Sequence, residues 1–144
     1  MRVFFDTSSL FKLYFKEDGT NELDELFNKN TITEIFLSEI TKVEFYSAVY
    51  NKFRTKFINE NQAKALIDSF NADFIQYKFI TVDNQIISSA QALLIKYGSK
   101  GLSALDSVQF ASVLSVKHQI DITVTADKLL HDFFAMEHLP TFDH

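Results

Sequence analysis

The chain has 144 residues, of which 47% are hydrophobic and 23% charged, and its net charge is −5. Three glycines and one proline exclude collagen, flexible linkers and Pro-rich tails, no apolar run is long enough for a membrane span, and the length suits one globular domain over residues 1–144. The absence of cysteine fits a cytoplasmic location, and the acidic balance excludes collection of nucleic acid by bulk attraction, so that a polyanionic ligand would need a local basic patch or a bound cation.

Short β-branched and aromatic runs alternate with helical patterns along the chain. In chain order we expect a strand over Arg2–Phe5, helices over Ser8–Phe15 and Thr20–Asn28, a strand over Glu34–Leu37, a long helix that starts at Ser38 or Thr41, a helix over Asn59–Phe74, a strand over Phe79–Val82, helices over Gln85–Tyr97 and Ser103–His118, a strand over Ile122–Thr125, a helix from about Ala126 to Met136, and an edge strand over Pro140–Phe142. Strands separated by helices predict the α/β class: a three-layer α/β/α sandwich around a mainly parallel sheet of four or five strands.

Four acidic residues occupy the same kind of position in this arrangement. Asp6 follows the first strand, and Glu44 lies in the first turns of the helix after the second strand. Asp106 lies in the first turn of the helix that starts at Ser103, and Asp127 follows the fourth strand by two residues. In an open parallel sheet, ligands bind in the crevice beyond the carboxyl ends of the strands. We therefore expect three or four of these carboxylates to converge on one pocket.

Such a cluster of carboxylates has a chemical use. Like charges a few ångströms apart repel, so the cluster is unfavourable unless a cation fills it. Hard oxygen ligands suit Mg²⁺ or Mn²⁺, and Mg²⁺ binds one or two carboxylates together with water and substrate phosphate. In phosphodiester hydrolysis such an ion activates water and neutralises charge on the scissile phosphate. The four acids are therefore candidate metal ligands and candidate catalytic groups.

Helix capping is an alternative interpretation of each acid. Thr41 and Glu44 match the pattern of a capping box, and Asp106 stands in the first turn of its helix in a similar pattern. Asp127 precedes a helix, where the helix dipole favours any acid, and Asp6 would cap the helix after it. Capping explains each acid separately, whereas convergence on one pocket explains all four together, and the sequence leaves both interpretations open.

The helix face that carries Glu44 holds small and polar side chains. Ser47, Ala48 and Asn51 share this face, which lies beside an aromatic one. Small neighbours would leave room for a ligand around the carboxylate. Close packing of the same face against another helix is the alternative.

The segment Thr41–Phe57 concentrates positive charge. It holds four basic residues against the single acid Glu44, which leaves a local charge of +3 in an acidic protein, and phenylalanines are interleaved with them. Bases of single-stranded RNA can stack on exposed aromatic side chains while cations follow the phosphates. An amphipathic helix with solvated lysines, or a surface for a protein partner, would give the same pattern. The candidate contacts are Lys42, Lys52, Arg54 and Lys56.

Four segments of the chain resemble the motifs of a known family. They are Val3–Tyr14, Leu37–Phe45, Gly101–Ala111 and Val124–Leu130, and each contains one of the four acids. Their order and spacing resemble those of PIN domains, most closely the small stand-alone ribonuclease toxins of type II toxin–antitoxin systems, the VapC type. The resemblance spans about residues 1–130, and the four motifs together carry it.

This resemblance implies a PIN-like α/β/α fold and a metal-dependent endoribonuclease, with Mg²⁺ or Mn²⁺ held by the acids and tRNA, rRNA or mRNA as substrate. The implied metal ligands are Asp6 and Asp106, together with Glu44 and Asp127, which would bind directly or through water. Ser8 and Thr125 fall where the family places hydroxyl groups that support the acids.

The resemblance also implies two protein partners. VapC-type proteins usually form homodimers, which would be two-fold symmetric here. They are held inactive by an antitoxin peptide laid across the helical region that corresponds to Thr41–Phe57. The aromatic positions of this segment are candidate contacts for that peptide.

Two other functions remain open. One is a catalytically inactive PIN-like scaffold that binds RNA or a protein partner without cutting. The other is aspartyl phosphoryl transfer, in which Asp6 would be the nucleophile. A haloacid-dehalogenase-like site would need an aspartate two residues later, where the chain has Ser8, and this counts against the second alternative.

Overall fold

The computed structural model describes residues 1–18 and 20–142 of the chain. Its strands are β1 (Arg2–Phe5), β2 (Glu34–Ser38), β3 (Tyr77–Ile80) and β4 (Ile122–Val124). They form one parallel sheet in the order β3-β2-β1-β4, which confirms the predicted sheet. The edge strand predicted over Pro140–Phe142 is reduced to a single parallel bridge between Thr123 and Thr141.

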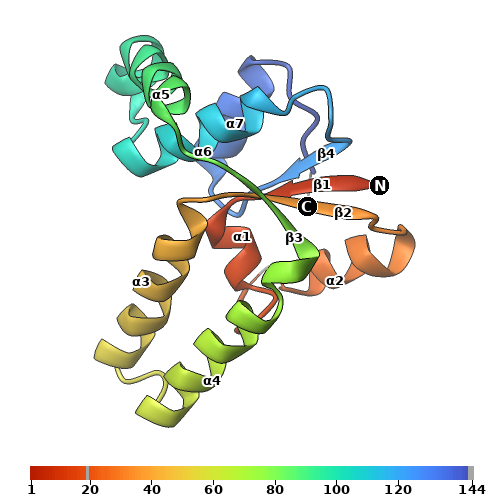
Figure 1. The fold of residues 1–144 in the computed structure, drawn as a ribbon, viewed down its shortest axis with the longest axis vertical. Helices are drawn as coiled ribbons and strands as arrows, with labels where there is room; N and C mark the ends of the chain where they lie inside the picture. The colour runs from red at the N-terminus through yellow and green to blue at the C-terminus, as the bar shows by residue number, and fades with distance from the viewer. Residues whose placement is uncertain (19, 143–144) are drawn as a thin grey trace.

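Helices cover both faces of the sheet, which confirms the predicted α/β/α sandwich (Figure 1). The helices α1 (Thr7–Phe11), α2 (Thr20–Lys29), α3 (Thr41–Arg54) and α4 (Glu60–Ala72) lie below the sheet in Figure 1, and α5 (Asn84–Tyr97), α6 (Ala104–Ser115) and α7 (Lys128–Met136) lie above it. Short 3-10 helices cover Phe74–Gln76 and Gly98–Lys100. Strand order reverses between β1 and β4, which makes their carboxyl ends the expected ligand crevice. In the part of the chain that the structure describes, no helix is both long and apolar enough to cross a membrane.

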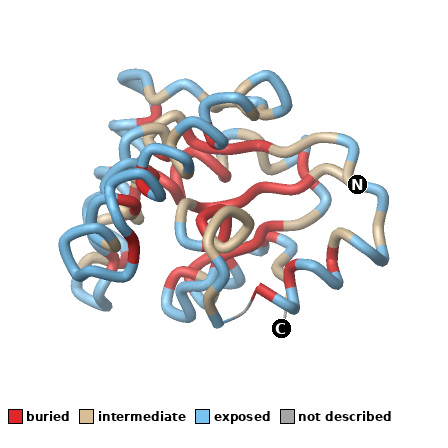
Figure 2. The backbone as a smooth tube through the Cα atoms, turned by 90° about the horizontal axis from the view of Figure 1, so that it is seen from below, coloured by how far each residue is buried: buried red, intermediate tan, exposed pale blue. Residues whose placement is uncertain are grey.

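The strand β1 contributes to two separate cores. Val3 and Phe5 belong to the core shared with α1 to α4, whereas Phe4 belongs to the core under α5, α6 and α7, and all three are fully buried. Figure 2 shows the central strands as buried and much of the helical surface as exposed. A strand covered on both faces must be apolar at every position, which is why β1 reads as a continuous apolar run. Each fully buried phenylalanine contributes about 1.5–3 kcal/mol to folding.

Most predicted elements differ from the structure in their bounds by a few residues, and the first helix and the third strand are the clearest cases. The sequence predicts a helix over Ser8–Phe15, whereas α1 ends at Phe11 and turns follow it. It also predicts a strand over Phe79–Val82, whereas β3 starts at Tyr77, which pairs with Ile35 of β2. In both cases tertiary contacts decide where the element ends, because periodicity alone is ambiguous over short apolar runs.

An aromatic cluster joins α3, α4 and the turns after α1. The rings of Phe45 and Phe70 stack with their centroids 4.1 Å apart, and Tyr14 meets them edge-on at 5.2 and 5.9 Å. The Tyr14 hydroxyl donates to the Asp73 carboxylate at 2.6 Å. These contacts hold Tyr14 outside the helical path that its spacing predicts. Because Phe45 directly follows Glu44, the cluster also fixes the first turns of α3, where Glu44 lies.

Candidate active site

The carboxyl ends of β1 and β4 bring two predicted site residues together. The parallel register pairs Phe5 with Val124, so Asp6 and Thr125 are the next residues of two neighbouring strands. The backbone N–H of Asp6 donates to the Val124 carbonyl at 3.2 Å, and the Thr125 hydroxyl donates to the Asp6 carboxylate. These residues therefore lie at the crevice where strand order reverses.

The Asp6 carboxylate is buried and accepts several hydrogen bonds. The Ser8 hydroxyl donates to its two oxygens at 2.9 and 3.0 Å, and Ser9 donates both its backbone N–H and its hydroxyl to Oδ1, at 3.0 and 2.8 Å. Burial raises the pKa of Asp6, while the hydrogen bonds from Thr125, Ser9 and Ser8 oppose that rise by stabilising the charged form. Asp6 is thus a carboxylate held in one place by its donors. Both hydroxyl residues expected beside the acids, Ser8 and Thr125, are among them.

Glu44 is bound by side chains from two other helices. Its Oε1 accepts hydrogen bonds from the Thr7 hydroxyl at 2.9 Å and from the Gln109 amide Nε2 at 2.7 Å. The Gln109 side chain is only 2% exposed, and its Nε2 also lies 3.0 Å from the hydroxyl oxygens of Thr7 and Thr41. Burial raises the pKa of Glu44, and the hydrogen bonds from Gln109 and Thr7 oppose that rise. One carboxylate thereby joins α1, α3 and α6.

Asp106 lies in the first turn of α6, and Asp127 is the residue directly before α7. Ser103 caps α6 by accepting the Asp106 backbone N–H at 3.3 Å, and Asp127 caps α7 by accepting the Leu130 backbone N–H at 3.0 Å. Burial raises the pKa of Asp106, the hydrogen bond with Ser103 lowers it, and the charge of Asp127 raises it. The two carboxylates therefore lie within each other's electrostatic field, although they come from different helices.

Electrostatic repulsion links all four acids. Beyond the effect of burial, the charges of Asp106 and Asp6 raise the pKa of Glu44, and the charge of Asp127 raises that of Asp106. A cation among them would relieve this repulsion. The donor set consists of hard carboxylate oxygens, which fits Mg²⁺ or Mn²⁺.

The chemistry of these donors suits a divalent ion better than their spacing does. Within residues 1–18 and 20–142, no three histidine, aspartate or glutamate side chains already stand at positions that would hold one ion together. Mg²⁺ is usually bound through one or two carboxylates while it keeps several waters. The residues therefore fit a divalent ion with few direct protein ligands and a hydrated remainder.

The capping interpretation holds for Asp6 and Asp127 and is wrong for Glu44, and for Asp106 it holds only in that Ser103 accepts its backbone N–H. Asp6 caps α1 and Asp127 caps α7. The capping box suggested by Thr41 and Glu44 does not form, because Ile40 is the N-cap residue of α3 and has no capping side chain. The Glu44 carboxylate instead receives its hydrogen bonds from α1 and α6. Capping alone does not explain Glu44.

The four predicted basic contacts do not form one patch. Lys52 lines a hollow of about 270 Å³ that also reaches the residues directly after Asp6. Lys42 lies over aromatic rings near β3, and Arg54 and Lys56 line a different hollow at the far end of α3. Lys52 is thus the member of the set that shares a hollow with Thr7 and Ser8, the donors to Glu44 and Asp6.

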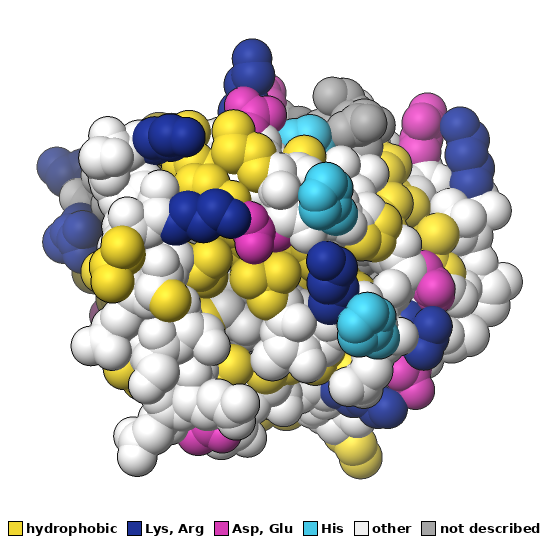
Figure 3. All heavy atoms as spheres, turned by 90° about the horizontal axis from the view of Figure 1, so that it is seen from above, with side chains coloured by type: hydrophobic (Ala, Val, Ile, Leu, Met, Phe, Trp, Pro, Cys, Tyr) yellow, Lys and Arg dark blue, Asp and Glu magenta, His cyan; other side chains and the backbone are white. Residues whose placement is uncertain are grey.

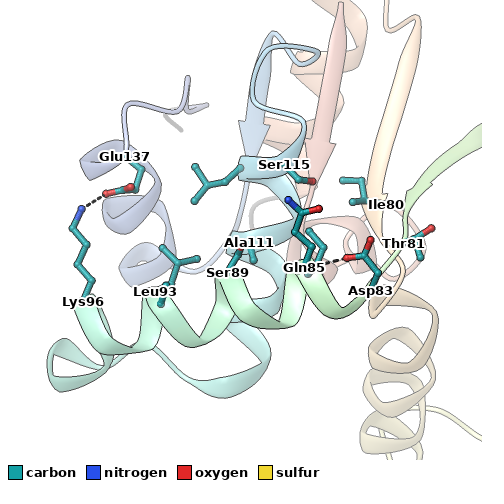
Figure 4. A pocket seen from close by; sticks show the side chains of 13 residues that line it. Ile80, Thr81, Asp83, Gln85, Ser89, Leu93, Lys96, Ala111, Ser115 and Glu137 are labelled. Atoms are coloured by element: carbon teal, nitrogen blue, oxygen red, sulfur yellow. Dashed lines mark hydrogen bonds and ion pairs between the residues drawn. The ribbon is translucent and has the colours of Figure 1, made fainter.

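A larger hollow, of about 730 Å³, lies on the opposite face of the sheet against α5 and α6. Gln85 of α5 points into it, and an ion pair between Lys96 and Glu137, with Nζ and Oε2 2.7 Å apart, closes one end (Figure 4). None of the four acids is among its described lining residues. On this face, shown in Figure 3, the visible acidic side chains are scattered singly among lysines, histidines and apolar groups. This hollow is therefore separate from the group of carboxylates.

Sequence reasoning misses the polar residues that hold Glu44. The motif pattern predicts no role for Gln109 or Thr7, and it predicts only a capping role for Thr41. It likewise predicts no role for Ser9, which donates to Asp6. The available signal was a glutamine on a strongly apolar helix, since an amide is buried only with partners. Its Oε1 has no hydrogen-bond partner among the described residues, although its Nε2 has three.

Comparison with known proteins gives one family match. The family model described as the PIN domain matches residues 3–133. No curated protein sequence matches the chain significantly. The match covers most of the chain and includes all four acids.

Several solved structures share this fold at low sequence identity. VapBC2 of Rickettsia felis, bound to a DNA fragment from its promoter, is 18% identical with a TM-score of 0.65, over 100% of this chain and 99% of that one. VapC20 of Mycobacterium tuberculosis, described as a sarcin-ricin loop cleaving toxin, is 15% identical with a TM-score of 0.68, over 91% and 94%. FitAcB of Neisseria gonorrhoeae is 16% identical with a TM-score of 0.68, over 98% and 96%. At these identities the likeness concerns the fold.

Proposed function

Because the chain belongs to the PIN domain family, we propose that it is a metal-dependent endoribonuclease that hydrolyses phosphodiester bonds of RNA in the cytoplasm, with residues 1–144 as one domain. The observation that carries the proposal is the placement of acids from separate parts of the chain near the carboxyl ends of β1 and β4. Asp6 follows β1 and accepts a hydrogen bond from Thr125, which follows β4. Glu44 accepts one from Thr7, the residue next to Asp6, and the neighbouring acids raise the pKa of Glu44 and Asp106. Burial and mutual repulsion make this group unfavourable without a cation. Structural capping explains two of the acids and does not explain Glu44.

Each acid has a role in this proposal. Asp6 and Asp106 are the first ligands of Mg²⁺ or Mn²⁺, and Glu44 and Asp127 bind it directly or through water. When bound, the cation lowers the pKa of an attacking water and neutralises charge on the scissile phosphate. Ser8 and Thr125 keep the Asp6 carboxylate in place and favour its charged form. Gln109 and Thr7 do the same for Glu44.

The biological role we propose is the toxin of a type II toxin–antitoxin pair. Similar folds occur in structures described as VapBC2, FitAcB and the sarcin-ricin loop cleaving toxin VapC20. The helix α3 carries an exposed apolar stripe at residues spaced three and four apart, a pattern suited to docking another helix. Its members are Val43, Tyr46, Tyr50 and Phe53, which are between 38% and 67% exposed. We assign this stripe to the antitoxin and expect the toxin itself to be a homodimer.

A scaffold that binds RNA or a protein partner without cutting is the second candidate. The observation that favours it is the lack, within the described residues, of three acids already arranged around one ion position. Such a scaffold would release no product with Mg²⁺ or Mn²⁺. It would also gain little thermal stability from either ion.

The decisive experiment is incubation of the purified chain with total RNA, with Mn²⁺, without Mn²⁺, and with Mn²⁺ plus a chelator. We expect discrete fragments only in the first condition. Asp6→Asn and Asp106→Asn should abolish cleavage while the circular dichroism spectrum stays that of the wild type. Cleavage by either purified variant at the wild-type rate would refute the nuclease proposal, and absence of cleavage by the wild-type protein would favour the scaffold.

A further inference from the structure

The 270 Å³ hollow between α1 and α3 is lined by an unusual combination of charges. Lys12 enters it from the end of α1, Lys52 from α3, and Glu17 from the loop before α2. Glu17 lies between the two lysines, with its carboxylate oxygens 4.0 Å from the Lys12 Nζ and 3.5 Å from the Lys52 Nζ. Two cations thus share one carboxylate, and the hollow keeps an excess of positive charge.

These cations are positioned rather than freely solvated. The Lys12 and Lys52 side chains are only 13% and 23% exposed. The Lys52 ammonium lies 5.1 and 5.0 Å from the ring centres of Phe15 and Phe57, and the Lys12 ammonium donates to the Asp18 carbonyl. A lysine whose stem is already packed loses less conformational freedom when it binds an anion.

The hollow is continuous with the carboxylate group. Thr7 and Ser8, two of its lining residues, donate hydrogen bonds to Glu44 and Asp6. Ala126, a third lining residue, directly precedes Asp127. An anion in the hollow would therefore sit beside the acids without competing for the cation that they bind.

Glu17 is the one carboxylate among the described residues that line the hollow. Its backbone N–H donates to the Thr20 hydroxyl at 3.1 Å, which keeps the loop in place while the side chain spans the lysines. Partly exposed ion pairs are worth about 0–1 kcal/mol, so an incoming phosphate with stronger charge-assisted hydrogen bonds can displace this carboxylate.

We propose that this hollow binds a backbone phosphate of RNA next to the phosphate that is cleaved, with Lys12 and Lys52 as its cations and Glu17 as a resident counter-ion that the phosphate displaces. The inference rests on the proposed ribonuclease function and names a second contact for the same substrate. It also explains how an acidic protein holds a polyanion, because the attraction is confined to one hollow.

The test is binding of a fluorescent single-stranded oligoribonucleotide, followed by anisotropy, to the full chain in a chelator, so that binding is measured without cleavage. Lys52→Gln should weaken binding about tenfold, the equivalent of about 1.4 kcal/mol, and should lower the slope of log affinity against log salt by about 0.7. Glu17→Gln should tighten binding several-fold, because the phosphate no longer has to displace a carboxylate. Lys12→Gln provides a second loss-of-charge variant, and the melting temperature of each variant verifies folding.

Matched controls separate the hollow from overall charge. Glu25→Gln makes the same change in net charge as Glu17→Gln, at an exposed pair with Lys29 on α2, and Lys64→Gln makes the same change as Lys52→Gln, at an exposed pair with Glu60. Equal effects of Glu17→Gln and Glu25→Gln, or of Lys52→Gln and Lys64→Gln, would overturn the inference. If the wild-type chain cleaves no RNA but Lys52→Gln still weakens binding and Glu17→Gln still tightens it, the nuclease proposal is refuted and the proposed phosphate site is supported.

Discussion

At the scale of single residues, Glu44 is the side chain whose surroundings have no simple structural purpose. It caps no helix, and it accepts hydrogen bonds from Thr7 of α1 and Gln109 of α6, whose side chains also contact the Thr41 hydroxyl. A buried amide that donates to a carboxylate forms a charge-assisted hydrogen bond, and such a bond is about twice as strong as a neutral one. Gln109 is therefore a positioning residue for Glu44.

Substitution of Gln109 should reduce cleavage without unfolding the chain. Gln109→Leu removes the donor and puts an apolar side chain in its place. Because a hydrogen bond to a charged group is worth about 1.5–3 kcal/mol, we expect a roughly 10- to 100-fold lower single-turnover rate in Mn²⁺. Gln109→Glu places a like charge beside Glu44 and should be more damaging. Wild-type rates for Gln109→Leu would show that the amide has no such role.

The raised pKa of Asp106 predicts a pH dependence of stability. Burial raises this pKa above its ordinary value of 3.8, so between the pKa of the unfolded chain and that of the folded chain only the folded chain holds the proton. The free energy of unfolding therefore falls as the pH rises from the lower of these two pKa values to the higher. Asp106→Asn cannot ionise and should lose less stability than the wild type between pH 4 and pH 7. Urea denaturation in a chelator measures this, with Asp24→Asn on the exposed face of α2 as the control. The same loss of stability in Asp106→Asn and wild type would contradict the prediction.

At the scale of elements, α3 combines two roles on different faces. Phe45 and Val49 are fully buried against the core, whereas Tyr46 and Tyr50 remain exposed. The buried face positions Glu44 through the stack of Phe45 on Phe70, and the exposed face is the proposed antitoxin stripe. The rigidity of one helix therefore serves both the site and the partner surface.

Loss of this stack should destabilise the whole domain. Phe70 is fully buried and contacts the rings of Phe45, Tyr14 and Phe74, so Phe70→Ala should lower the free energy of unfolding by about 3–5 kcal/mol. Ile75→Ala, at a side chain that is 93% exposed, should change it by less than about 0.5 kcal/mol. Urea denaturation of both variants tests the contrast. A loss below about 1 kcal/mol for Phe70→Ala would mean that α4 does not support α3 as described.

At the scale of the whole molecule, the sequence predicts the α/β/α architecture and the candidate acids, but not the side chains that hold those acids in place. Strand and helix order follow from local patterns, and Asp6 and Asp127 could be placed because Asp6 directly follows β1 and Asp127 stands between β4 and α7. The pairing of Gln109 with Glu44 spans 65 residues, and it depends on where the fold places α6 relative to the start of α3. No local pattern encodes such a contact.

The positions of the charged side chains also depend on contacts between distant parts of the chain. Lys52 and Glu17 meet in the hollow although they are 35 positions apart, since 52 minus 17 is 35. Summing the charges of Thr41–Phe57 gives one basic patch, whereas the fold sends Lys42, Lys52 and Arg54 to three different places. Only the folded arrangement shows that Lys52 shares a hollow with Thr7 and Ser8.

The central claim is that Asp6, Glu44, Asp106 and Asp127 share one divalent cation. The most direct test is a crystal grown with Mn²⁺ and measured at the manganese absorption edge. We predict an anomalous peak at the carboxyl ends of β1 and β4, in direct contact with the carboxylates of Asp6 and Asp106, and its loss in Asp6→Asn. A fully occupied manganese elsewhere, or no peak at saturating Mn²⁺, would contradict the account.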